Sequence, residues 1–321
     1  MLTEMNVSRR DFLKGGGMAA GGLLATSSLP ALADKPSVFP NRGEFERLSL
    51  QFFEIEAGAT KPFTLLHISD THLTAAYPDD IPRAVRRAPG RTRTFGGRQE
   101  EALRDSIAWA KKHVDYLVHT GDIMDCHSRA NFDLVRKYFG EADSMMFGCI
   151  GNHEYSDGMN DGKHSEEDKK AAFDQMAAAF PFDVRFTSNV VNGVNFVCLD
   201  NAHGTISAEL AARFETEAKK GLPMILCMHC PFVLRNIGHA ARRFWRFDKK
   251  YKLIPDMSGF KENLKDDMTR EFVAYLRAQP LLKGILCGHG HYGVVDQFSP
   301  TAKQYMVAAN FFFHGQEFTI R

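Results

Sequence analysis

The sequence lacks the features that would place it at once in a broad class. It has only six cysteines in 321 residues, too few for a disulfide scaffold. Its net charge is +1, so no whole-chain field directs it to nucleic acid or to an acidic membrane. After residue 33 it has no apolar run of the 18 or more positions that a membrane helix needs. It contains no internal repeat, and its composition is ordinary for a globular protein.

The N-terminus carries an export pattern. Residues 8–14, Ser-Arg-Arg-Asp-Phe-Leu-Lys, precede a weakly apolar stretch, and Ala31-Leu32-Ala33 follows as a small-x-small cleavage signal. The pattern resembles a twin-arginine export signal, and a basic tail before an amphipathic helix is the alternative. The stretch contains five glycines and breaks at Pro30, so it would anchor poorly in a membrane. We therefore predict a signal peptide at 1–33, a single catalytic domain at 34–321, and no stable membrane insertion after cleavage.

Strand and helix patterns alternate along the mature chain. Short apolar or alternating runs predict strands at 48–56, 63–69, 116–119, 145–150, 222–228, 282–287, 304–309 and 316–320. Helical spacing predicts helices at 99–114, 132–139, 165–179, 206–220 and 268–278. Asn192-Gly193 between two β-rich runs predicts a hairpin within 184–200. We expect an α/β protein with two packed sheets, some antiparallel pairing, and helices outside.

Five of the predicted strands end in residues that can bind metal ions. The motifs are Asp70-Thr71-His72, Gly121-Asp122 with Asp125, Gly151-Asn152-His153-Glu154, Met228-His229, and Gly288-His289-Gly290-His291. Because ligands gather beyond the carboxyl ends of strands in an open α/β sheet, we expect these side chains to converge on one spot. The adjacent glycines would let the backbone turn tightly beside the ions.

The ligand types indicate the class of metal. Carboxylate, imidazole and amide oxygen without a thiolate motif suit Mn, Fe or Zn better than Ca²⁺. Two such ions ~3.5–4 Å apart can clamp the attacking and leaving oxygens of an in-line displacement. Such a pair needs a bridging carboxylate to offset the repulsion between the cations. Any one of these residues alone could be a buried polar group, but five motifs in order rarely arise by chance.

In this order the motifs resemble those of the calcineurin-like metallophosphoesterase superfamily, over residues 70–291. The resemblance implies a four-layer αββα sandwich of two mixed β-sheets flanked by helices. It implies one metal held by Asp70, His72, Asp122 and His291, and a second held by Asp122, Asn152, His229 and His289, with Asp122 as the bridge. It further implies a hydroxide between the ions as nucleophile, and His153 as the group that stabilises or protonates the leaving oxygen.

The sequence departs from the motif patterns of several known subfamilies, which argues against assigning it to them. Asp125 stands where purple acid phosphatases carry a tyrosine, and Cys126-His127 follows where protein Ser/Thr phosphatases continue differently. Only 30 residues follow His291, too few for the second domain of exported 5′-nucleotidases. What remains is similar to small bacterial phosphodiesterases and phosphomonoesterases.

The predicted function is metal-dependent hydrolysis of phosphate mono- or diesters outside the cytoplasm. A cyclic-nucleotide phosphodiesterase is the narrower alternative, and a non-catalytic metal-binding scaffold is the alternative of another class. We expect a phosphorylated small molecule or lipid headgroup as substrate, the twin-arginine machinery as a partner, and no nucleic acid. The location would be periplasmic or secreted.

Several residues beside the motifs carry weaker expectations. Six arginines in 83–98 and a basic stretch at 235–252 predict loops over the site, which either attract anionic substrate or are merely solvated. Asp125 and Glu154 would orient the ligands, and His67 and His119 would pack beside them. Most of the cysteines fall in predicted strands as buried thiols, although Cys227 and Cys230 could instead form a redox or zinc pair.

Overall fold

The computed structural model describes residues 47–156, 166–245 and 266–321. By its contacts the chain divides into residues 1–42 and 43–321, and every described residue belongs to the second unit. The predicted signal peptide, its cleavage site and residues 246–252 of the second basic stretch lie outside the described residues. Within the described ranges, no helix combines the length and the apolar character that a membrane span requires.

The first sheet is mixed and has the strand order β1-β11-β2-β3-β4. Its strands are β1 (Ser49–Ile55), β11 (His314–Ile320), β2 (Phe63–Ile68), β3 (Tyr116–Thr120) and β4 (Met146–Cys149). β11 runs parallel to β1 and antiparallel to β2, whereas β2, β3 and β4 are parallel to one another. Because those three strands are parallel, their carboxyl ends share one edge of the sheet.

The second sheet is also mixed, with the order β5-β6-β7-β8-β10-β9. Its strands are β5 (Phe186–Val191), β6 (Val194–Leu199), β7 (Met224–Cys227), β8 (Leu282–Cys287), β10 (Lys303–Met306) and β9 (Val294–Gln297). The four central strands β6, β7, β8 and β10 are parallel, and each outer strand is antiparallel to its neighbour. Here too the parallel strands bring several carboxyl ends to one edge.

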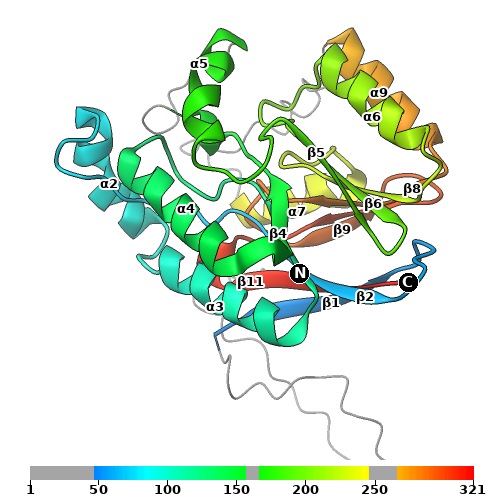
Figure 1. Ribbon diagram of the computed structural model, residues 1–321, viewed down its shortest axis with the longest axis horizontal. Coiled ribbons are helices and arrows are strands. Elements are labelled where there is room, and N and C mark those ends of the chain that lie inside the picture. The colour runs from blue at the N-terminus through cyan, green and yellow to red at the C-terminus, as the bar shows by residue number, and fades with distance from the viewer. Residues whose placement is uncertain (1–46, 157–165, 246–265) are drawn as a thin grey trace, which may run out of the picture. The chain divides into compact units, whose positions relative to one another are not determined.

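Three buried clusters separate the layers. One lies between the sheets and contains Leu65 and Val118 of the first sheet with Phe196 and Ile225 of the second. Adjacent strand residues face opposite sides, so Leu66 turns outward and packs under α3 (Gln99–His113), α4 (Arg129–Ala142) and α5 (Glu166–Ala177). The outer face of the second sheet packs under α6 (Ala208–Ala218) and α9 (Asp267–Ala278) (Figure 1). The predicted four-layer αββα sandwich is therefore confirmed.

Most of the predicted elements are present, and the Asn192-Gly193 turn joins β5 to β6 as expected. The expectation of loops was wrong for most of 83–98 and for 235–245: α2 spans Pro82–Thr94 and α7 spans Arg235–Trp245. Pro82 suits the first turn of a helix. Pro89 lies inside α2, whose buried Ala84 and Ala88 pack against Cys126. Strand β9 was missed because its residues are only partly buried and do not alternate in polarity.

The surroundings of Gly148 and Gly140 predict that substitution by alanine has opposite effects on stability at the two positions. A Cβ at Gly148 in β4 would lie 1.9 Å from the carbonyl oxygen of His119 in the paired strand, and backbone atoms there cannot yield. A Cβ at Gly140 in α4 would meet nothing within 4 Å. Gly148→Ala should lower the free energy of unfolding by about 1–3 kcal/mol or more, whereas Gly140→Ala should raise it by up to about 1 kcal/mol.

Denaturant unfolding of both variants beside the parent chain measures these changes. Equal stabilities for the two alanine variants would contradict the placement of β4 against β3.

Candidate metal centre

The motif residues converge at the carboxyl ends of the parallel strands. Asp70, His72, Asp122 and His291 each offer one ligand atom, and these atoms all lie within 4.8 Å of one another. The Nε2 of His291 is 3.3 Å from Oδ1 of Asp70, and the Nε2 of His72 is 3.6 Å from Oδ2 of Asp122. The chain thus brings together, from three loops, the four residues predicted for one ion.

A second group shares Asp122 with the first. Asp122, His229 and His289 also place their ligand atoms within 4.8 Å of one another. Oδ2 of Asp122 lies 3.2 Å from Nε2 of His229 and 3.6 Å from Nε2 of His72. Asp122 is therefore common to the two ligand groups.

Hydrogen bonds decide which imidazole nitrogens face the centre. Nδ1 of His229 lies 2.7 Å from the carbonyl oxygen of Thr120, which only accepts, so this nitrogen donates and Nε2 is the atom left for a metal. Nδ1 of His72 is likewise held 3.2 Å from Oδ1 of Asp125. The second ring nitrogen of His229 lies close to a nitrogen of the other histidine in its ligand group: His229 Nε2 and His289 Nδ1 are 3.1 Å apart. Nitrogen atoms gathered this way suit a shared cation.

Two buried oxygens show that the residues fit metal ions. Oδ1 of Asp70 and Oδ1 of Asn152 are buried and have no hydrogen-bond partner, a costly state for an acceptor unless a cation satisfies it. The side chain of Asn152 is an amide, so Asn152 is not counted in either of the two groups of carboxylate and imidazole ligands. Its neighbour His153 nevertheless donates its backbone N–H to Oδ1 of Asp122 at 2.9 Å, which places Asn152 beside the shared aspartate.

The carboxylates and histidines of the centre shift one another's pKa. Burial raises the pKa of Asp122, but the positive charges of His229 and His153 outweigh it and hold that pKa well below its usual range. Burial lowers the pKa of His153 and His229, and the charge of Asp122 reverses this, raising them to about 10 and about 9. Without metal, protonated histidines therefore neutralise the carboxylates. Bound cations would take over this role.

The ligand backbones are held in an unusual conformation. Among the described residues, seven non-glycine residues have positive φ, and five of them are Asp70, His72, Asp122, His289 and His291, with φ between 51° and 70°. This left-handed region is disfavoured for residues with a Cβ, and such strain clusters at functional sites. The surrounding fold must therefore impose these turns.

Close packing of the ligand loops explains two of the neighbouring glycines. A Cβ at Gly151 would lie 2.3 Å from Oδ1 of Asp122, and one at Gly288 would lie 1.9 Å from Oγ of Ser69. Neither glycine has positive φ, so here the requirement is space rather than a tight turn. Any side chain at either position would push one ligand loop away from the next.

Glu154 and Asp125 hold the loops from behind. The carboxylate of Glu154 accepts backbone N–H groups of Asp122 at 2.8 Å, Met124 at 3.0 Å and Gly151 at 2.6 Å. Burial, followed by the charge of Asp122, raises the pKa of Glu154 to about 7. Asp125 contacts the rings of His72 and His153. Both acids contact ligand loops in the way that orienting groups do.

His67, His119 and the six cysteines belong to none of the ligand groups. His67 pairs with Thr120 Oγ1 and His119 with Thr71 Oγ1, each at 2.9 Å, and burial lowers the pKa of both to about 3. All six cysteines are buried and free. Cys227 and Cys230 therefore form no disulfide.

The sequence did not lead us to expect that aromatic and basic side chains pack against the first ligand group. Phe95 stacks on the ring of His72 with centroids 4.3 Å apart, Phe311 packs against both rings, and Arg91 bonds Asp125. A signal was available, since Ala84, Ala88, Arg91 and Phe95 follow one face of a helix. The Pro89-Gly90 pair obscured it.

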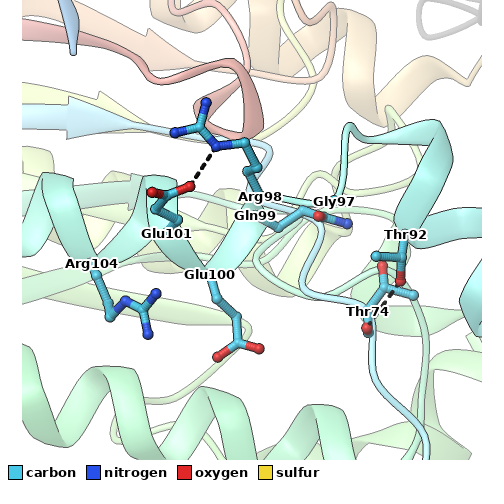
Figure 2. Close-up of a pocket in the computed structure, with 8 residues that line it drawn as sticks. All are labelled: Thr74, Thr92, Gly97, Arg98, Gln99, Glu100, Glu101 and Arg104. Atoms are coloured by element: carbon cyan, nitrogen blue, oxygen red, sulfur yellow. Dashed lines mark hydrogen bonds and ion pairs between the residues drawn. The ribbon is translucent and has the colours of Figure 1, made fainter. Parts of the chain in front are cut away.

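A pocket of about 330 Å³ opens at the junction of α2 and α3, lined by Thr74, Thr92, Gly97, Arg98, Gln99, Glu100, Glu101 and Arg104 (Figure 2). None of the predicted ligands lines it. Thr74 donates its hydroxyl to the carbonyl oxygen of His72 at 2.9 Å, so the pocket adjoins the back of that loop. The chemistry belongs to the ligand groups and not to this pocket.

Two ligand groups that share one aspartate, at the edge of a four-layer sandwich, define a class of metal-dependent hydrolase with paired ions. The chain belongs to the calcineurin-like phosphoesterase family, whose sequence profile matches residues 63–293. It is accordingly a phosphoric ester hydrolase, and the family together with the ligand groups supports two metal ions. Residues 6–26 match the twin-arginine translocation signal, which confirms an export signal at the N-terminus.

Solved structures resemble the chain at low identity. A dimetal phosphatase from Danio rerio is 14% identical, over 78% of this chain and 88% of that one, with a TM-score of 0.43. Purple acid phosphatase PPD1 from yellow lupin is 10% identical over 78% and 44%, with a TM-score of 0.46. Phosphopantetheinyl hydrolase from Mycobacterium tuberculosis is 13% identical over 78% and 91%, with a TM-score of 0.40. The comparison with curated proteins gave no match.

Glu154→Gln tests whether one carboxylate ties the motif loops together. Glutamine has a single acceptor oxygen, and its amide N–H₂ would face a backbone N–H, so at least one buried donor loses its partner. We expect the free energy of unfolding to fall by about 1–3 kcal/mol and the metal content to fall with it. Denaturant unfolding and elemental analysis measure both, with the exposed Glu141→Gln of α4 as control. Parent-like values for Glu154→Gln would contradict this role.

Proposed function

We propose that the chain hydrolyses phosphate mono- or diesters outside the cytoplasm, using two metal ions. One ion would be held by Asp70, His72, Asp122 and His291, and the other by Asp122, Asn152, His229 and His289. The observation that carries the proposal is that Asp122 belongs to both ligand groups, with its Oδ2 3.6 Å from Nε2 of His72 and 3.2 Å from Nε2 of His229. A structural core has no need for such a buried carboxylate beside two imidazoles.

The chain's own residues supply orientation and a proton. When bound, the two cations would polarise the phosphoryl group and make water a stronger nucleophile. Nδ1 of His153 lies 2.9 Å from the backbone oxygen of Asp125, so it donates there and leaves Nε2 to face a substrate. The rings of His153 and His72 are 4.6 Å apart. These contacts support our assignment of His153 as the residue that would donate a proton to the leaving oxygen.

The substrate class and the location complete the proposal. We infer a phosphorylated small molecule or lipid headgroup as substrate, and a periplasmic or secreted product of twin-arginine export. The export signal supports the location. Arg91 is engaged with Asp125, so it is not a free basic group for attracting substrate.

A metal and substrate panel tests the proposal, with Asp122→Asn as its mutant arm. The mature chain should hold about two ions after purification in Mn²⁺ and hydrolyse 4-nitrophenyl phosphate, bis(4-nitrophenyl) phosphate or cyclic AMP, with activity lost on chelation and restored by metal. Asp122→Asn should lose metal and turnover together, because the bridge loses its charge. The exposed Asp133→Asn of α4 is the control.

Fewer than one ion per chain, with no hydrolysis of any ester, would favour a non-catalytic scaffold instead. Two ions in Asp122→Asn would show that the bridge is misplaced.

His153→Ala separates proton donation from metal binding. The variant should keep its metal, because His153 belongs to neither proposed ion, and should lose about 10²–10⁴-fold in kcat. Elemental analysis and steady-state kinetics measure the two effects, with His113→Ala at the end of α3 as control. Undiminished turnover in His153→Ala would remove this histidine from the mechanism.

A further inference from the structure

Helix α2 presents one face to the ligand loops. Ala84 and Ala88 pack against Cys126 in the loop that carries Asp122 and Asp125. Arg91 and Phe95 continue the same face toward the helix end, at spacings of three and four residues. The small side chains let the helix approach closely, and the two large ones then extend over the metal ligands.

Arg91 binds Asp125 with two hydrogen bonds. Its Nε donates to Oδ2 at 2.8 Å and its Nη2 donates to Oδ1 at 2.6 Å, the fork geometry that fixes a carboxylate in both position and rotation. The Asp125 side chain is fully buried, while Arg91 remains 24% exposed. A guanidinium at the surface thus holds a carboxylate in the interior.

The same carboxylate contacts two functional histidines. Oδ1 of Asp125 lies 3.2 Å from Nδ1 of His72 and 3.1 Å from Nδ1 of His153. One of these rings is a proposed metal ligand and the other is the proposed proton donor. A rotation of Asp125 would therefore disturb both rings at once.

Phe95 fills the space between the guanidinium and the first ring. The Cζ of Arg91 lies 4.7 Å from the centroid of Phe95, and Phe95 stacks on His72 at an interplanar angle of 14°. The arginine side chain thus runs over an aromatic face, where cation–π attraction favours it. This contact limits the conformations from which Arg91 can reach Asp125.

We propose that Arg91 is a positioning residue, which locks Asp125 so that His72 and His153 are held in the orientation that metal binding and proton donation need. The inference rests on the proposed function for its catalytic consequence. Lysine cannot replace arginine here, because a single ammonium cannot bond both carboxylate oxygens in one plane. The positioning itself follows from the contacts and does not depend on the substrate.

The kinetic test uses the metal-loaded mature chain with Arg91→Ala and Arg91→Lys. Arg91→Ala should lower kcat about 10–100-fold with little change in KM. Phenyl phosphate should lose more than 4-nitrophenyl phosphate, because the poorer leaving group depends more on a donated proton. Arg91→Lys should lose less, and added guanidinium should partly restore Arg91→Ala. Arg104→Ala, an exposed arginine on α3, is the charge-matched control.

A spectroscopic test reports the rings directly. Two-bond ¹H–¹⁵N spectra of zinc-loaded, histidine-labelled protein should show His72 and His153 each with a fixed Nδ1–H in the parent chain. Arg91→Ala should lose the fixed form for His153 and weaken the affinity for the first ion. If Arg91→Ala does not fold, Arg91→Lys decides, since it keeps the side-chain stem over Phe95.

Either of two results would overturn the inference: parent-like kcat in Arg91→Ala, or equal losses on both esters with unchanged histidine spectra. If the parent chain hydrolyses neither these monoesters nor the diesters bis(4-nitrophenyl) phosphate and cyclic AMP, the proposed function fails. The histidine spectra then still decide whether Arg91 fixes the rings.

Discussion

The concentration of buried negative charge at one sheet edge is the constraint on which the rest of the structure depends. Asp70, Asp122 and Asp125 are fully or almost fully buried. Each belongs to a group of side chains whose possible ligand atoms lie within 4.8 Å of one another. Carboxylates in such a place are stable only when cations or donors surround them. Histidines, backbone N–H groups and one arginine supply part of that compensation, and the unpartnered oxygens of Asp70 and Asn152 mark where it is incomplete.

The fold meets this constraint by holding the ligands in place through backbone and packing. Left-handed backbone occurs at five ligand positions, and the absence of a side chain at Gly151 lets the Asp122 loop pack closely against it. Glu154 then ties two of the loops together through their N–H groups. The buried core between the sheets fixes the strands from which these loops emerge. The centre is thus organised by the protein itself, which lowers the cost of ordering it when ions bind.

Strand geometry makes part of the centre predictable from the sequence alone. Asp70, Asp122 and His229 could be placed together because parallel strands share a carboxyl edge, and the alternation of elements with the family resemblance predicts the sandwich. The role of α2 was not predicted, because Pro89-Gly90 suggests a loop and obscures the helical spacing of the residues that pack against Cys126. Arg91 was hidden for a related reason: six arginines lie together in the sequence, and only the folded chain shows which one reaches Asp125.

Asp125 also belongs to a third cluster of polar side chains beside the two proposed ion sites. His72, Asp125 and His153 form a third group whose ligand atoms are close enough for a metal. Its nitrogen atoms, however, are both Nδ1, and that of His153 already faces the backbone oxygen of Asp125 as a donor. The carboxylate in turn receives two hydrogen bonds from Arg91, which hold its pKa well below its usual range against the opposing effect of burial. The guanidinium of Arg91 is thus the cation of this third group. Since Asp125 contacts the Nδ1 atoms of His72 and His153, it leaves their Nε2 atoms for the roles proposed above.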